Sequence, residues 1–85
     1  MKVVNKKIDI VTWFDEEGIH PVRFRYKDKE SEKVIKIDKV LFQYEEKFAG
    51  SLLKVFRCKS KINNEEKVYE IKYNTKECNW LLFKI

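Results

Sequence analysis

The side chains best suited to acid–base or nucleophilic chemistry are few and widely spaced in this 85-residue chain. The single histidine, His20, has no second histidine or cysteine at a metal-ligand spacing. Adjacent carboxylates occur in polar stretches at 16–17, 45–46 and 65–66, where they point apart and stay hydrated, so they make poor acid–base couples. The 2 glycines leave no phosphate-binding loop. We therefore expect no enzyme activity, no metal site and no cofactor.

The two cysteines, Cys58 and Cys78, form no CxxC motif. Arg57 and Lys59 flank Cys58, but neighbours on a strand point to opposite faces, so they should activate its thiol little. We expect two half-buried free thiols in a reducing compartment. The first residues include no apolar run long enough for a signal peptide or a membrane span, which predicts a cytoplasmic protein without a membrane partner.

Positive charge is the strongest indication of a binding function. The net charge is +5 and the pI about 9.2, and Arg23 and Arg25 alternate with apolar residues in the stretch Pro-Val-Arg-Phe-Arg-Tyr at 21–26. On a strand, both guanidinium groups lie on one face. Small curled barrels bind nucleic acid through such faces, with basic side chains along phosphates and exposed aromatic rings against bases. The residues that we predict to bind nucleic acid are Arg23, Arg25, Arg57, Lys36, Lys54 and Lys72, provided that the strand registers bring them together.

A second class of function is open at this point. Arg23, Arg25 and Arg57 are the only arginines among 19 basic residues, whereas nucleic-acid readers favour arginine for its two-pronged hydrogen bonding. The 14 acidic residues are mixed with the lysines, as is typical of a solubilising surface. The alternative is a protein-interaction or homodimerising subunit with no affinity for nucleic acid. Tryptophan is usually largely buried, which favours a core or a subunit interface for Trp13 and Trp80, while the burial of Tyr44 is open.

The elements that would position these residues are predicted to be strands. Short polar clusters recur every 10–16 residues or so, the spacing of hairpin turns in an all-β domain. Between them lie segments rich in β-branched and aromatic residues, which predict a single domain over 1–85 with about six antiparallel strands in meander order, forming a bent sheet or a partly open small barrel. These segments span about 3–14, 19–27, 33–44, 51–61, 67–74 and 78–85.

Several segments depart from simple alternation. In 33–44 the apolar residues move from odd-numbered to even-numbered positions near Asp38–Lys39, and in 51–61 they do so after Val55. Such a change of parity predicts a β-bulge in each segment. A short helix or helical turn near 39–49 is the alternative for the first, since Asp38 could cap it and Gly50 could end it. The segments 3–14 and 78–85 are apolar on both faces, so they are central strands or are covered by a partner such as a second copy.

Landmarks along most of the chain resemble a group of small uncharacterised bacterial all-β proteins, a domain of unknown function. They are a Pro-x-x-Phe-x-Tyr strand at 21–26, a Val-Leu end to the third segment at 40–41, a Phe-Arg-Cys strand at 56–58 and a terminal Trp-x-x-Phe at 80–83. The resemblance implies an all-β fold. It implies no activity and no functional residues.

Overall fold

The computed structural model describes all residues, Met1–Ile85, and contains seven β-strands and no helix. The predicted all-β fold is confirmed, with one strand more than expected. None of its elements is a helix that could cross a membrane. The strands are β1 (Val3–Asp15), β2 (Gly18–Asp28), β3 (Ser31–Lys36), β4 (Lys39–Phe48), β5 (Ser51–Ile62), β6 (Glu65–Asn74) and β7 (Asn79–Lys84).

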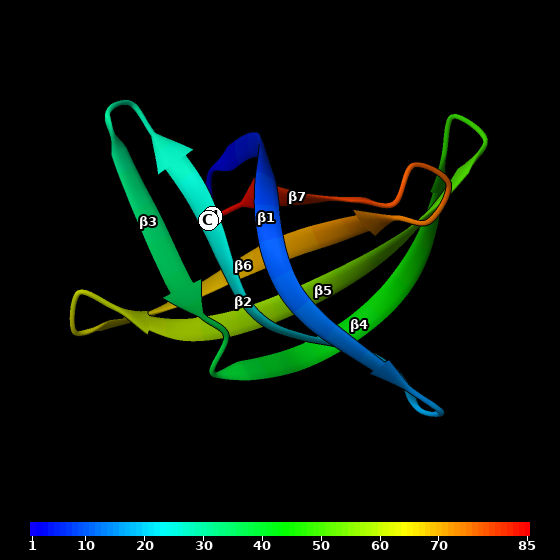
Figure 1. Cartoon of the computed structure of the whole chain (residues 1–85), viewed down its shortest axis with the longest axis horizontal. Helices are drawn as coiled ribbons and strands as arrows, with labels where there is room; N and C mark the ends of the chain where they lie inside the picture. The colour runs from blue at the N-terminus through cyan, green and yellow to red at the C-terminus, as the bar shows by residue number, and fades with distance from the viewer.

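The strands form one bent, open sheet in the order β3-β2-β1-β7-β6-β5-β4, and all neighbours are antiparallel (Figure 1). The order is that of a meander in two halves, β1–β3 and β4–β7, joined where the first and last strands pair. Every connection except the one from β3 to β4 joins neighbours in the sheet. Because β3 continues into β4 without reversing direction, β1 and β7 run antiparallel and can pair.

The link between β3 and β4 brings the two edges of the sheet together at one corner. The Ile37 N–H donates to the Val22 carbonyl of β2 (2.9 Å), and the Asp38 N–H donates to the Lys59 carbonyl of β5 (3.1 Å). The chain therefore exchanges β2 for β5 as its partner within two residues. The predicted single segment 33–44 is two strands for this reason, and the parity change near Asp38–Lys39 marks the exchange.

A helix near 39–49 is wrong. Residues 39–48 form the edge strand β4, whose bulge lies at Leu41, between the pairs Val40–Cys58 and Phe42–Arg57. Asp38, a possible helix cap in the sequence, instead accepts a hydrogen bond from the Lys61 N–H (2.8 Å).

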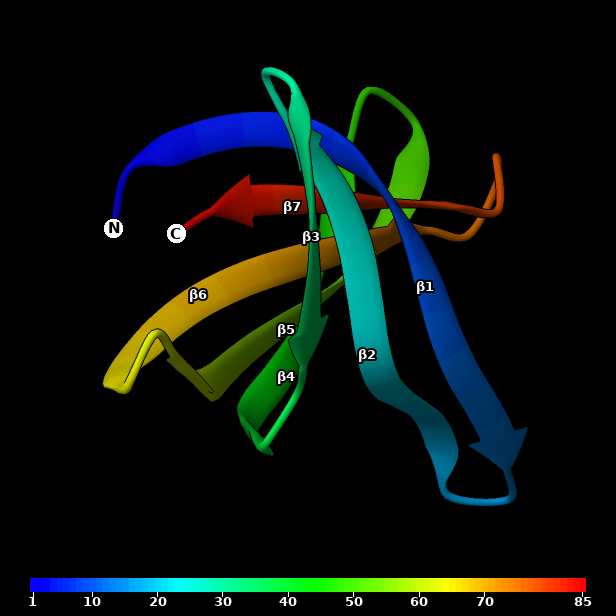
Figure 2. The ribbon, with the colours of Figure 1, turned by 60° about the vertical axis from the view of Figure 1, so that its left-hand side comes forward.

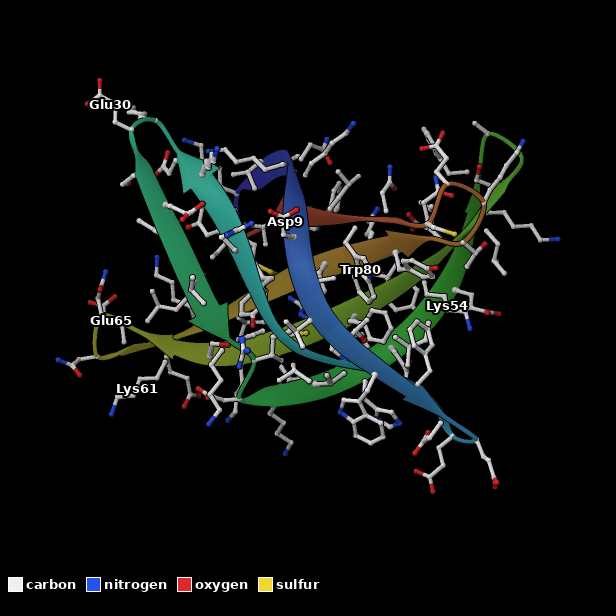
Figure 3. All side chains as sticks on the ribbon, viewed as in Figure 1. Asp9, Glu30, Lys54, Lys61, Glu65 and Trp80 are labelled. Atoms are coloured by element: carbon white, nitrogen blue, oxygen red, sulfur yellow. The ribbon has the colours of Figure 1, made fainter.

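The core fills the concave side of the bent sheet. Trp80 of β7, labelled in Figure 3, is 6% exposed. Its ring centroid lies 5.4 Å from that of Phe56 and 4.8 Å from that of Tyr73. Phe24 of β2 lies 5.5 Å from Tyr69 of β6, so the two halves of the sheet pack against each other. The cluster of buried core residues comprises Ile8, Phe24, Ile35, Ile37, Phe56, Cys58, Tyr69, Ile71, Trp80 and Leu82.

A bulge in the segment 51–61 is also wrong. β5 pairs with β6 from Leu53 to Ile62 without a register shift. Val55 is 0% exposed, yet it lies outside the core cluster, on the opposite face from Phe56. Its register neighbours there are Tyr44 and Lys72. The change of parity therefore reflects a strand that is covered on both faces.

The two-sided apolar strands are central, as one of the two interpretations predicted. β1 and β7 pair with each other in the middle of the sheet, through Lys6–Leu82, Lys7–Leu81 and Ile8–Trp80. The chain ends continue this pairing, since Lys2 and Ile85 exchange backbone hydrogen bonds of 2.8 and 2.9 Å. This pairing accounts for their central place in the sheet, while Val3, Val11, Trp13 and Phe14 of β1 remain exposed.

Candidate functional site

Two cations lie directly opposite each other on neighbouring strands. Arg23 of β2 is the register partner of Lys36 of β3, and both side chains are exposed. Neither forms an ion pair. Because Ile37 and Val22 form the adjacent hydrogen-bonded pair, the Arg23–Lys36 pair is of the non-hydrogen-bonded kind, in which side chains approach most closely. Two like charges at such a position oppose folding unless an anion lies between them.

Arg25 shares this face but is already neutralised. Its guanidinium donates to the Asp9 carboxylate of β1 (2.9 Å) and lies 3.5 Å from that of Glu32 on β3. The hydrogen bond to Asp9 and the charge of Glu32 raise the pKa of Arg25 above its usual value. Arg25 therefore joins three strands across the face instead of offering a free charge.

An aromatic pair stands beside the cations. The ring of Trp13 on β1 stacks on the imidazole of His20 on β2, with centroids 3.9 Å apart and planes inclined by 17°. The Asp15 carboxylate, 2.8 Å from His20 Nε2, holds the imidazole in place. This hydrogen bond lowers the pKa of Asp15. Trp13 is nevertheless 52% exposed, so the ring is held on one side and open on the other.

A bulge in β2 places the aromatic pair on the same face as the cations. Val11 opposes Arg23 and Thr12 opposes Pro21, so Val22 is the extra residue and β1 keeps its alternation. Val11 and Trp13 therefore point to the same side of β1. The hairpin that carries Trp13 extends beyond the rest of the sheet (Figure 2). We define the cationic–aromatic face by Val11, Trp13, His20, Arg23 and Lys36.

A hollow of about 270 Å³ borders this face at Val11 and Arg23, on the side away from Trp13, where Asp9, Arg25 and Val34 also line it. This volume is below the ~300–1,000 Å³ of a typical small-molecule site. Because the hollow is small and the side chains around it are exposed, it suits contact with part of an extended ligand.

The other predicted cations are engaged elsewhere. Arg57 of β5 faces Glu70 of β6 at 3.7 Å, and Lys72 of β6 donates to Glu46 of β4 at 2.7 Å. The Lys72 ammonium also lies 3.6 Å from the ring centroid of Phe83. Arg57 and Lys72 thus stabilise the outer face of β4–β7, where they help to cover Val55.

Lys54 does not join either group. It is paired with Glu45 at 3.9 Å on the other face of β5 from Arg57, because the two are three residues apart on an uninterrupted strand. In Figure 3 Lys54 lies well apart from Asp9, the partner of Arg25. Of the six predicted binding residues, the structure brings together Arg23, Arg25 and Lys36, and it separates Arg57, Lys54 and Lys72 from them.

The sequence favoured a core or subunit-interface position for Trp13 and Trp80 and left the burial of Tyr44 open, and the structure divides these residues. Trp80 is a core residue, whereas Trp13 and Tyr44 are exposed. Tyr44 lies on the outer face of β4, where partial desolvation of its hydroxyl and the nearby carboxylates of Glu70 and Glu46 raise its pKa. The sequence indicated no aromatic stacking by His20. Its stacking on Trp13 depends on the bulge at Val22, which no local pattern in the sequence shows.

The cysteines are free and differ in environment. Cys58 is fully buried in the core and Cys78 is exposed, so the prediction of two half-buried thiols holds for neither. Burial raises the pKa of the Cys58 thiol to about 12. No group of three or more histidine, cysteine or acidic side chains is arranged to hold a metal ion.

Fold and site together define a small, open, bent β-sheet domain with a cationic–aromatic face at one end. No family model, curated protein or solved structure matches the chain significantly. The resemblance to small bacterial all-β proteins therefore stays a prediction.

Proposed function

We propose that this protein is a small nucleic-acid-binding module and that the cationic–aromatic face holds the phosphate backbone through Arg23 and Lys36. The observation that carries the proposal is that two cations without carboxylate partners lie directly opposite each other on β2 and β3. Like charges at such positions are unfavourable by about 0.2–1 kcal/mol, and a phosphate group between them would remove that cost.

The surroundings of this pair support an extended polyanion. The neighbouring cation, Arg25, is held by Asp9 and Glu32, so of the three predicted cations on this face only Arg23 and Lys36 have no ion pair. Exposed Val11 lies in the same row as Arg23, and exposed Val34 lies in the next row beside Arg25. They offer apolar surface against which sugars can pack, and the carboxylate of that next row, Asp9, is already paired with Arg25. The proposed role is binding and not catalysis. The proposal includes a cytoplasmic location, with which the two free thiols agree because the cytoplasm is reducing.

The test is a titration of the protein with single- and double-stranded oligonucleotides between about 50 and 200 mM salt. Phosphate contacts predict that the logarithm of the binding constant falls linearly with the logarithm of the salt concentration. The double substitution Arg23→Gln/Lys36→Gln should weaken binding and reduce the slope by about 0.7 for each lost contact on single strands.

The matched control is Lys47→Gln/Lys76→Gln, which removes the same number of charges. These lysines lie at the β4–β5 and β6–β7 turns, at the other end of the molecule from β3 (Figure 1). The control should leave the slope nearly unchanged. Absence of binding at 50 mM salt or so, or equal losses in both double variants, would overturn the proposal.

A further inference from the structure

We infer that the open side of the Trp13 ring is a stacking site for an unpaired nucleobase, so that the protein binds single strands in preference to duplexes. This inference rests on the proposed function and names the form of nucleic acid that the same face takes. A base inside a duplex has both ring faces covered by its neighbours, whereas an unpaired base can lie flat on an aromatic side chain.

The Trp13 ring is fixed in place before any ligand arrives. His20 covers one of its faces at 3.9 Å, and Asp15 holds His20 through a 2.8 Å hydrogen bond. No other aromatic ring or cation packs on Trp13. Trp13 is 52% exposed, so much of the residue remains accessible to a ligand on the side that His20 does not cover. A ring held in this way loses little conformational freedom when a base stacks on it.

The spacing between the ring and the cations suits one nucleotide. Trp13 follows Val11 by two residues on β1, and Val11 lies in the same row as Arg23 and Lys36. At a rise of about 3.4 Å per residue, the ring stands about 7 Å along the strand from the cationic row. That separation allows a phosphate to lie between the two cations while a neighbouring base reaches the indole.

The acidic turn limits the site on its far side. Asp15, Glu16 and Glu17 follow Trp13 after one intervening residue, Phe14, and they would repel a phosphate that continued past the indole. The strand should therefore run from the indole across the sheet toward β3, and not along the hairpin to its tip.

The experiment compares single-stranded and duplex oligonucleotides of one sequence with three variants of the full chain. Trp13→Leu should weaken single-strand binding about 5- to 150-fold, the range measured for loss of one stacked base, and change duplex binding less than about twofold. Trp13→Phe should retain most of the single-strand affinity, since it keeps an aromatic face. Phe14→Leu is the matched control, because Phe14 is similarly exposed but points to the other side of β1.

Tryptophan fluorescence gives a second readout on the unmodified protein. Trp80 is buried and Trp13 is exposed, so quenching by a bound base should come from Trp13 and disappear in Trp13→Leu. Equal affinity for both forms of nucleic acid, or equal losses in Trp13→Leu and Phe14→Leu, would overturn the stacking site while leaving the phosphate contacts intact. The stacking site would also be overturned if Arg23→Gln/Lys36→Gln abolished binding while Trp13→Leu bound single strands as tightly as the unmodified protein. No binding by the unmodified protein would overturn the proposed function itself.

Discussion

At the scale of single residues, the arginines show how one residue type serves two purposes. Arg57 is opposite a carboxylate, and Arg23 is opposite another cation. Glu70, the partner of Arg57, has a side chain only 6% exposed, so it depends on that guanidinium for compensation of its charge. Arg23 compensates no buried group. The two positions should therefore respond differently to the same substitution.

Replacing Arg57 with glutamine should lower the free energy of unfolding by about 2 kcal/mol or more, because it leaves a buried carboxylate without its partner. Replacing Arg23 with glutamine should leave that free energy unchanged or raise it by up to about 1 kcal/mol, because it removes the repulsion by Lys36. Urea denaturation of both variants checks this. A larger loss in Arg23→Gln than in Arg57→Gln would contradict the assignment.

The two thiols provide a second prediction at this scale. The pKa of Cys58, about 12, exceeds that of an ordinary thiol, so Cys58 stays protonated and inert at neutral and mildly alkaline pH. Alkylation of the folded protein at pH 8 or so should modify Cys78 alone, and Cys58 should react only after unfolding. Mass spectrometry of the modified peptides distinguishes the two. Rapid modification of Cys58 in the folded protein would contradict its burial.

At the scale of the elements, the corner between β3 and β4 holds the open sheet in its bent shape. The Ser60 hydroxyl of β5 donates to the Lys36 carbonyl of β3 at 2.6 Å. Its single proton is then in use, so the Tyr69 hydroxyl, also 2.6 Å away, must donate to Ser60. This chain of hydrogen bonds links β6, β5 and β3, and it fixes the backbone from which the Lys36 side chain projects.

Ser60→Ala should therefore cost more stability than Tyr69→Phe. The first substitution leaves both the Lys36 carbonyl and the Tyr69 hydroxyl without a partner, at about 1–3 kcal/mol for each buried group that water cannot reach. The second leaves the bond from Ser60 to Lys36 in place, at a cost of about 1 kcal/mol. Thermal or urea denaturation measures both. A smaller loss for Ser60→Ala would show that the corner does not depend on this network.

Alternation and turn composition in the sequence were sufficient to predict the all-β class and the meander within each half of the sheet. They also showed that Arg23 and Arg25 share an exposed face. The strand register could not be predicted, because the cross-strand neighbour of each cation is distant in the chain. These neighbours are Glu70 for Arg57, Glu46 for Lys72 and Lys36 for Arg23. Only the pairing shows which cations remain free.

The division at Ile37–Asp38 could not be predicted for a related reason. A change of parity along a strand has the same appearance in the sequence whether it comes from a bulge, from a strand covered on both faces or from an exchange of partner. In this chain, 33–44 shows an exchange of partner and 51–61 shows two covered faces. The helical pattern at 39–49 failed because β4 obtains its hydrogen bonds from β5.

At the scale of the whole molecule, the sheet carries two outer surfaces of different character. The outer face of β4–β7 holds its charges in ion pairs, namely Arg57 with Glu70 and Lys72 with Glu46. The cationic–aromatic face on β1–β3 leaves Arg23, Lys36 and one side of Trp13 open. An anionic ligand should therefore prefer β1–β3, although both surfaces include basic and aromatic residues.

The most direct test of this account is a map of backbone amide shifts, and of the two indole N–H shifts, as a short single-stranded oligonucleotide is added at low salt. The largest changes should fall at Arg23, Lys36 and the Trp13 indole, while Tyr44 and Arg57 on the outer face of β4–β7 stay nearly unchanged. Shifts concentrated at Tyr44 and Arg57, or no shifts at all, would contradict the assignment of the binding face.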